Sequence, residues 1–318
     1  MAARSEISQH IDSFLEYLEV EKGSSPLTIR NYRHYLTRFL EYLEHEGIRT
    51  NLADINKETV RMFRLYLSRL PGSPRNSQLD AETLSRRTQG YHVIALRSFL
   101  RWLIKNDFKV MSPDKIDLPK VKDREVQFLS GEQVDKILNA PTLSNINGKR
   151  DKAILEVLFS TGLRVSELVK LNKDKIDFAS REFGVVGKGG RARVVFLSQR
   201  AASWIQNYLD ARRDHFTPLF IRHKGKVDPS TSSENMRLTP RSVQRMIKKY
   251  SHKMKLPIEV TPHVLRHSFA TDLLMAGADL RSVQEMLGHK NVQTTQIYTH
   301  VTNKQLKDVH EAFHGRVK

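Results

Sequence analysis

A short segment near the C-terminal end of the chain places a proton carrier beside a phosphate-binding group. In Thr261-Pro-His-Val-Leu-Arg, the Thr-Pro pair is typical of a helix start, so His263 and Arg266 share one helical face. This pairing suits phosphoryl transfer, because a histidine can move a proton while a guanidinium binds the phosphate. Two alternatives stay open. His263 and His267 are spaced like a zinc-binding pair, although Val264 stands where that motif needs glutamate. The pair could also be ordinary polar surface.

Four other residues have suitable chemistry, and each has an ordinary alternative. Arg164 follows a glycine turn, where it could simply form a salt bridge with Glu167. Lys188 stands in a glycine-rich turn and could be a solvated turn lysine. His289 comes directly after a glycine that ends a helix, a common place for a surface or capping residue. Tyr298 lies nine residues further on, and a lone tyrosine more often packs than reacts.

The joint order of these residues is more specific than any one of them. Arg164, Lys188, His263-x-x-Arg266, His289 and Tyr298 resemble the active-site series of the tyrosine recombinase (phage-integrase-type) family. The segments TGLRVSELVKL, GKGGRARVV, HVLRHSFATDLLMAGADLRSVQEMLGH and TTQIYTHV are most similar to those of Xer site-specific recombinases. The N-terminal SPLTIRNYRHYLTRFLEYL and IALRSFLRWL resemble the DNA-clamping helical domain of that family, so the likeness covers nearly the whole chain.

Two positions depart from the Xer pattern. Asp272 stands where those proteins commonly have histidine, but that position is not a catalytic one. Gly315 stands where proline is common, which weakens any inference about the partners of the C-terminal segment.

The resemblance implies a reaction in which Tyr298 attacks a DNA phosphodiester and forms a 3′-phosphotyrosine, leaving a free 5′-hydroxyl. Arg164 and Arg266 would bind the charge on the nonbridging oxygens, and His289 would donate a further hydrogen bond. Lys188 would protonate the departing oxygen, and His263 would take the tyrosine proton. We expect no cofactor, no metal and no ATP, because arginines hold the charge and the covalent link conserves the bond energy.

The charge of the chain agrees with a polyanionic partner. The formal net charge is +18, with 53 basic and 35 acidic residues, and nucleic acid is the commonest partner of such an excess. Residues 1–107 have a net charge of +3 and residues 108–318 one of +15, so the stronger phosphate-binding surface is expected in the second part. The chain has no cysteine, which excludes disulfides and thiolate sites. It shows no signal peptide or membrane span, and we expect it in the cytoplasm.

Residues 1–107 are predicted to be a helical core-binding domain that clamps DNA. Apolar residues recur at helical spacing, Ser25-Pro26 is typical of a helix start, and Pro71-Gly-Ser-Pro breaks the chain. A fourth helix is expected from about Thr83 to Asn106. It carries Arg86, Arg87, Arg97 and Arg101, which could bind a DNA backbone or could form a solvated basic face.

Residues 108–127 are predicted to be a linker, and residues 128–318 a catalytic domain that is mostly helical with a small β-hairpin around Lys188. The expected fold class is therefore mainly α, with a mixed α/β catalytic part. Residues 302–318 are predicted to form a short amphipathic helix. It could pack on its own domain or dock on a neighbouring protomer.

We expect a site-specific DNA recombinase that resolves chromosome dimers. Its expected partners are double-stranded DNA and other protomers, in a homo- or hetero-tetramer on two recombination sites. A second recombinase and an activating DNA translocase are open possibilities. An integrase of a mobile element would have the same motifs. A type IB topoisomerase would use similar chemistry as a monomer, and a DNA-binding regulator would lack some of the six catalytic positions.

Overall fold

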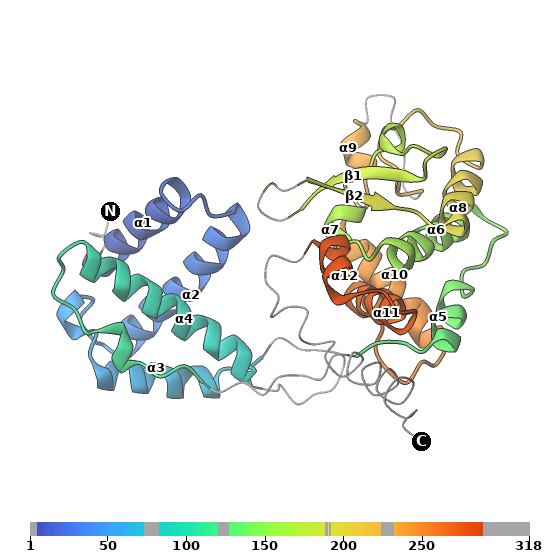
Figure 1. Ribbon diagram of the computed structural model, residues 1–318. Helices are drawn as coiled ribbons and strands as arrows, with labels where there is room; N and C mark the ends of the chain where they lie inside the picture. The colour runs from blue at the N-terminus through green and yellow to red at the C-terminus, as the bar shows by residue number, and fades with distance from the viewer. Residues whose placement is uncertain are drawn as a thin grey trace, which may run out of the picture. The chain divides into compact units, whose positions relative to one another are not determined.

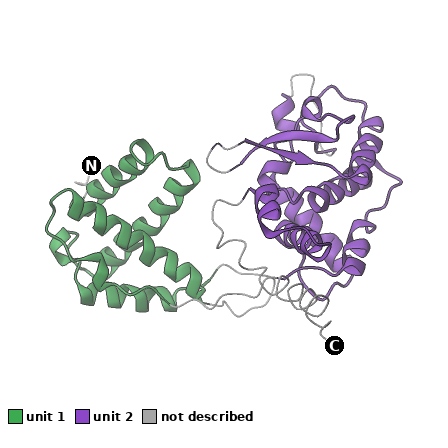
Figure 2. Ribbon diagram, viewed as in Figure 1, with its two compact units in different colours: residues 1–124 green, residues 125–318 purple. Residues whose placement is uncertain are grey.

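The computed structural model describes residues 5–72, 83–119, 127–187, 190, 192–223 and 232–288. The chain divides into two compact units, residues 1–124 (unit 1) and residues 125–318 (unit 2), which Figure 2 shows in different colours. Each unit has its own large buried core, and each is described by itself. Of the helices that the structure describes, none is both long and apolar enough to cross a membrane.

Unit 1 consists of helices around an aromatic core. Its elements are α1 (Glu6–Val20), α2 (Pro26–His45), the 3₁₀ turn η1 (Leu52–Asp54), α3 (Lys57–Arg69), α4 (Arg86–Lys105) and the 3₁₀ turn η2 (Pro113–Lys115) (Figure 1). Phe14, Phe39, Phe63 and Phe99 come one from each helix and are all buried. Rings pack across helices, with centroids 5.6 Å apart for Phe14 and Phe99 and 4.9 Å apart for Phe39 and Phe63. Burial of this cluster therefore joins all four helices.

Capping residues set the helix starts of unit 1. The Ser25 hydroxyl accepts a hydrogen bond from the Thr28 N–H, as the Ser-Pro pair predicts. The start expected at Thr83 for the fourth helix is wrong, because α4 begins at Arg86. Ser85 is its N-cap and accepts from the Thr88 N–H at 3.2 Å. Thr83 instead pairs with Pro71 in an isolated antiparallel bridge, which keeps it out of the helix.

The first part of the expected linker packs on unit 1. Ile116 is buried in the core of that unit, and Phe108, Val110 and Met111 pack against it. Residues 120–126 lie outside the described residues. The division at residues 107 and 128 stays a prediction.

Unit 2 is mostly helical with one small sheet. Its elements are α5 (Gly131–Leu138), α6 (Ile146–Thr161), α7 (Val165–Leu168), the 3₁₀ turn η3 (Lys173–Lys175), β1 (Glu182–Val186), β2 (Ala192–Phe196), α8 (Gln199–Asp210), α9 (Ser233–Met236), α10 (Pro240–Lys253), α11 (Pro262–Met275) and α12 (Leu280–Leu287). Helix α6 is buried at every position from Ala153 to Leu158, because α8 and α11 both pack on it. It is the central helix of this core.

Strands β1 and β2 form the antiparallel hairpin that the β-prone runs predict. Phe183 pairs with Val195 and Val185 pairs with Arg193, and these four side chains share the less exposed face of the hairpin. In Figure 1 the hairpin lies next to α7, and β2 also packs on α6 and α12. Residues 188, 189 and 191 of the turn lie outside the described residues. The expected fold class, mainly helical with a small sheet, is confirmed.

Candidate active site

Arg266 lies at the centre of a cluster of polar side chains in unit 2. Helix α11 begins where Thr261-Pro262 predicts, with the Thr261 hydroxyl accepting from the Val264 N–H at 3.2 Å. One turn on, the Arg266 side chain enters the protein, and the residue is only 4% exposed. Its Nη1 donates to the Gly162 carbonyl at 2.6 Å, and its Nη2 donates to the Leu287 carbonyl at 2.7 Å.

Both carbonyls belong to helix C-termini, where backbone acceptors have no partner within the helix. Gly162 ends α6 and Gly288 follows α12, each in the left-handed conformation. A cation is favoured at such an end, because the helix dipole is negative there. Glycine is required at residue 162, since an added Cβ would lie 2.5 Å from Phe269 Cδ1 and 2.9 Å from Leu287 Cδ2. Two helix ends thus fix the guanidinium of Arg266 before any substrate arrives.

Arg164 stands at the start of α7, two residues after Gly162. Its backbone N–H donates to Glu167 Oε2 at 3.0 Å, and its Nη1 donates to Glu167 Oε1 at 2.9 Å. The salt bridge that the sequence offered as the ordinary alternative is therefore present. The Arg164 side chain is still 28% exposed, so its guanidinium remains accessible to a phosphate.

Arg193 belongs to the same cluster, although it was not among the residues predicted from the sequence. Its Nη2 and Nη1 donate to the two carboxylate oxygens of Glu167 at 2.8 and 3.2 Å, and its Nε donates to the Met286 carbonyl at 3.2 Å. One signal could have identified it. In the alternating run Ala-Arg-Val-Val-Phe, residue 193 falls on the same face as the buried Val195, which is an unusual place for an unpaired charge.

The Glu167 carboxylate is buried beneath these two arginines. Burial alone would raise its pKa, but hydrogen bonds from the Arg193 side chain and the Arg164 N–H outweigh burial and lower the pKa to about 2. Glu167 is therefore a permanent negative charge between two permanent positive charges.

His263 is exposed on the first turn of α11. Desolvation, together with the positive charges of Arg266 and Arg164, lowers the pKa of His263. Desolvation, with the charges of His263 and Arg266, lowers the pKa of His267 to about 4. Both rings are neutral at pH 7, and a neutral imidazole can accept a proton. His263 thus has the protonation state that a general base needs.

The structure brings together three of the six predicted catalytic residues, namely Arg164, His263 and Arg266. Lys188, His289 and Tyr298 lie outside the described residues. Two of them are close in sequence to residues of the cluster. Lys188 comes five residues before Arg193, and His289 directly follows the Gly288 that ends α12.

The predicted DNA-binding arginines lie on α4 in unit 1. Arg86, Arg87 and Arg101 are exposed, whereas Arg97 is partly buried and pairs with Asp114 at 3.4 Å. At helical spacing all four fall on one side of α4, which agrees with a face that tracks a backbone.

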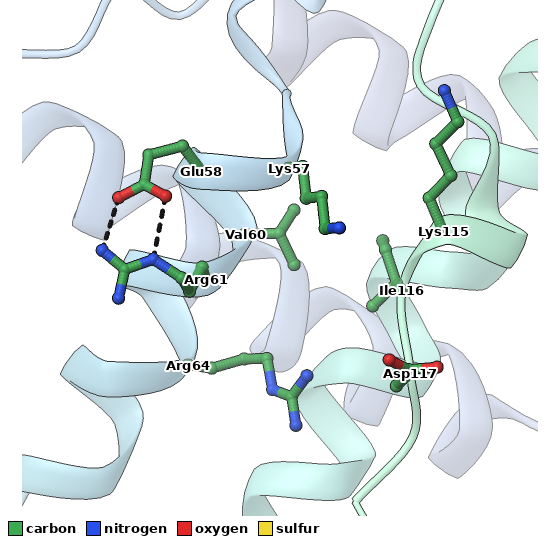
Figure 3. A pocket seen from close by; sticks show the side chains of 8 residues that line it. All are labelled: Lys57, Glu58, Val60, Arg61, Arg64, Lys115, Ile116 and Asp117. Atoms are coloured by element: carbon green, nitrogen blue, oxygen red, sulfur yellow. Dashed lines mark hydrogen bonds and ion pairs between the residues drawn. The ribbon is translucent and has the colours of Figure 1, made fainter.

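A groove of about 370 Å³ adds further cations to unit 1. It lies between α3 and η2, over an apolar floor of Val60 and Ile116. Figure 3 shows Lys57, Arg64 and Lys115 around it, while Arg61 is paired with Glu58 through two hydrogen bonds. It contains none of the six catalytic candidates, all of which belong to unit 2.

Comparison with protein-family models gives two matches that together cover most of the chain. The model described as "Phage integrase family" matches residues 127–305, and "Phage integrase, N-terminal SAM-like domain" matches residues 11–107. The tyrosine recombinase XerC of Pelotomaculum thermopropionicum is 37% identical over 314 residues, which are 97% of this chain and 99% of the relative. The tyrosine recombinase XerD of Listeria innocua is 37% identical over 310 residues, 96% of this chain and 98% of the relative.

Solved structures agree in fold. The XerH site-specific recombinase bound to palindromic difH substrate, a post-cleavage complex, matches with a TM-score of 0.70 at 21% identity, covering 96% of this chain and 84% of that one. The Tn1549 transposon integrase in complex with transposon right end DNA matches with a TM-score of 0.68 at 20% identity, covering 96% of this chain and 99% of that one. At this identity the likeness concerns the fold alone.

Proposed function

The chain belongs to the phage integrase family of tyrosine recombinases, and we propose that it recombines chromosomal DNA at a specific site and so resolves chromosome dimers. It is a site-specific DNA recombinase acting on double-stranded DNA, as its motifs predicted. Relatives named XerC and XerD, each 37% identical over nearly their full length, support the chromosomal role.

One observation carries the assignment of the active site. The Arg266 guanidinium is held by the carbonyls of Gly162 and Leu287, next to Arg164 and within the electrostatic reach of His263. A phosphate oxygen placed here meets two fixed cations and a neutral base. Donors that are already oriented need no reorganisation as charge develops, and this is where electrostatic catalysis is strongest.

The cleavage step follows from these groups. The phenolic oxygen of Tyr298 attacks the scissile phosphorus while His263 takes its proton. A bond forms between Tyr298 and the 3′ phosphate, and the bond from phosphorus to the 5′ oxygen breaks. Lys188 protonates that oxygen, which leaves as a hydroxyl.

The pentavalent transition state carries its extra charge on the nonbridging oxygens. Arg164 and Arg266 bind this charge, and His289 donates a hydrogen bond to it. Rejoining reverses the step: a 5′ hydroxyl of the partner strand attacks the phosphotyrosine, and Tyr298 leaves. The phosphodiester energy is conserved in the covalent link, so the reaction needs no ATP. Arg164 and Arg266 would supply the positive charge that a metal ion supplies in other phosphoryl transfers.

Unit 1 is proposed to clamp the duplex. Arg86, Arg87, Arg97 and Arg101 of α4 would contact the phosphate backbone, and the basic groove beside α3 offers further cations. The active complex would be a tetramer on two recombination sites. Its protomers would be joined by docking of residues 302–318 of one protomer on its neighbour. A second recombinase and a DNA translocase are proposed as further partners, and the cytoplasm, where such a chromosome lies, as its compartment.

The test is whether DNA becomes attached at Tyr298. The wild-type protein is trapped on genomic DNA, the attachment point is sequenced, and a nicked suicide substrate is built from that site. We expect wild type to accumulate a covalent adduct and Tyr298→Phe to bind the same DNA with unchanged affinity but form none. An adduct of undiminished yield from Tyr298→Phe would overturn the assignment of the nucleophile.

A further inference from the structure

Arg193 uses every nitrogen of its guanidinium within the protein. The residue lies on β2, its side chain is 13% exposed, and its three donors reach Glu167 Oε1, Glu167 Oε2 and the Met286 carbonyl. Its Cδ and Nη1 also lie 3.2 and 3.3 Å from the place that a Cβ on residue 288 would occupy, so the side chain runs closely along Gly288. These contacts hold β2, α7 and the end of α12 together at this point.

The three elements that Arg193 joins are those that lead to the catalytic candidates. Glu167 lies on α7 and is bonded to Arg164. Met286 lies in the last turn of α12, three residues before His289. Strand β2 itself follows the turn that holds Lys188. The partly buried Arg193 side chain therefore joins the hairpin to α7 and to the end of α12.

The charges of this cluster explain why a second arginine is needed. Glu167 is a buried carboxylate, and its side chain is 6% exposed. With Arg164 as its sole partner, the pair would be neutral, and the low dielectric of the interior would hold the two charges firmly together. Arg193 supplies the compensating charge by a bidentate contact. The triad then has a net charge of +1, and that charge belongs to Arg164, the more exposed of the two arginines.

We propose that Arg193 is a positioning residue of the recombination reaction: it neutralises Glu167, so that Arg164 can direct its guanidinium to the scissile phosphate while Glu167 still orients it. This proposal rests on the proposed function, in which Arg164 binds that phosphate. It assigns to Arg193 an effect on the rate of cleavage that is transmitted through Glu167 and does not involve contact with DNA.

The decisive experiment is a double-mutant comparison of single-turnover cleavage at saturating protein, on the nicked suicide substrate. We expect Arg193→Ala to cleave about 10²-fold more slowly than wild type, because sequestering Arg164 is equivalent to removing one oriented donor to the phosphate. Glu167→Gln keeps an acceptor for Arg164 without the charge, so it should be slowed less than tenfold. Adding Glu167→Gln to Arg193→Ala should raise the rate of the single variant at least tenfold, because Arg164 is then no longer sequestered.

Rates are compared per folded molecule, because Glu167→Gln also relieves the buried charge that Arg193→Ala leaves without its partner. On that basis a residue that only held the fold would give no rescue. A double variant no faster than Arg193→Ala would therefore overturn the proposal, as would a wild-type rate in Arg193→Ala. Folding is followed by the fluorescence of Trp204 in α8, in a Trp102→Phe background. If Arg193→Ala does not fold, Arg193→Gln replaces it in the same comparison. Arg193→Gln keeps an N–H donor for Glu167 but removes the charge, and the same rescue by Glu167→Gln is required.

A sulfur substrate separates Arg193 from the general acid. When sulfur replaces the bridging 5′ oxygen, the leaving group needs no proton, so Lys188→Ala should regain most of its rate while Arg193→Ala and Arg164→Ala should not. If the sulfur substrate restored the cleavage rate of Arg193→Ala, then Arg193 would act on the leaving group. That result would contradict a role through Arg164. Failure of the proposed function looks different, because wild type itself would then form no adduct.

Discussion

The arginines of the site in unit 2 and those of α4 in unit 1 have the same side chain, held in two different ways. Arg266 is 4% exposed and is bound by two helix ends. Arg86, Arg87 and Arg101 are exposed on one side of a helix. A cation held in one position stabilises one arrangement of charge, such as that of a transition state. A solvated cation can move to meet any phosphate along a DNA backbone. On the proposed function, the first kind of arginine suits catalysis and the second suits DNA binding.

The largest effect is expected at Arg266. Arg266→Ala should slow single-turnover cleavage about 10²–10³-fold, because an oriented donor to the phosphate is removed. It should also destabilise unit 2, since each buried carbonyl left without a partner costs about 1–3 kcal/mol. Urea unfolding, followed by Trp204 in a Trp102→Phe background, measures the second effect.

Arg266→Lys is the matched variant for that measurement. It keeps the charge, but a single ammonium cannot reproduce the planar fork that reaches Gly162 and Leu287 together. We expect its cleavage rate to stay at least tenfold below wild type. A wild-type rate in Arg266→Lys would mean that charge alone matters here, and the contrast with α4 would disappear.

A smaller effect is expected from the glycines that end helices in the two units. Gly162 and Gly47 both have a positive φ, +59° and +64°, but only Gly162 has side chains within 4 Å of its missing Cβ. Gly47→Ala in unit 1 should cost about 1–2 kcal/mol of unfolding free energy from backbone strain alone. Gly162→Ala should cost about 1–3 kcal/mol more, from overlap with Phe269 and Leu287.

Trp102 lies in unit 1 and Trp204 in unit 2, so urea unfolding of each variant can be followed in the unit that carries it once the other tryptophan is replaced by phenylalanine. Equal destabilisation by the two glycine substitutions would show that the overlap at Gly162 relaxes freely, and that the end of α6 is no more rigid than the end of α2.

The smallest effects are expected on α4. Arg86→Ala, Arg87→Ala and Arg101→Ala should each weaken DNA binding uniformly across sequences. Each should also make the slope of log affinity against log salt shallower by about 0.9 for every phosphate that is no longer neutralised. Arg97→Ala should do less, because Arg97 already pairs with Asp114. Cleavage at saturating protein should not change in any of them. A slower rate at saturation would give α4 a part in catalysis and remove the distinction between the two sets of arginines.

The sequence predicted the parts of the fold that depend on neighbours along the chain. Ser25-Pro26 and Thr261-Pro262 begin helices as expected, because a capping residue acts within its own first turn. The fourth helix begins at Arg86, after its N-cap Ser85, and not at Thr83. Thr83 is held outside the helix by its bridge to Pro71, a contact across a chain break that no local signal indicates.

In the described part of the candidate site, the sequence could place His263 beside Arg266 but could not identify the groups that hold these residues. His263 and Arg266 are three residues apart, and helical spacing alone places them together. Glu167 and Arg193 are 26 residues apart on different elements, and their bidentate pairing depends on how the folded chain brings the hairpin to α7. The two carbonyls that bind Arg266 are equally hard to predict. They are 104 and 21 residues away from Arg266 in the sequence, and no pattern of side chains identifies a backbone acceptor.

The last turn of α12 is held by both Arg193 and Arg266, through the carbonyls of Met286 and Leu287. The chain then passes Gly288 directly into His289 and the C-terminal segment. A displacement of this last turn would therefore be resisted by hydrogen bonds from charged donors, which are stronger than neutral ones. The position of this helix end and the electrostatic field of the two arginines are thereby coupled through two side chains.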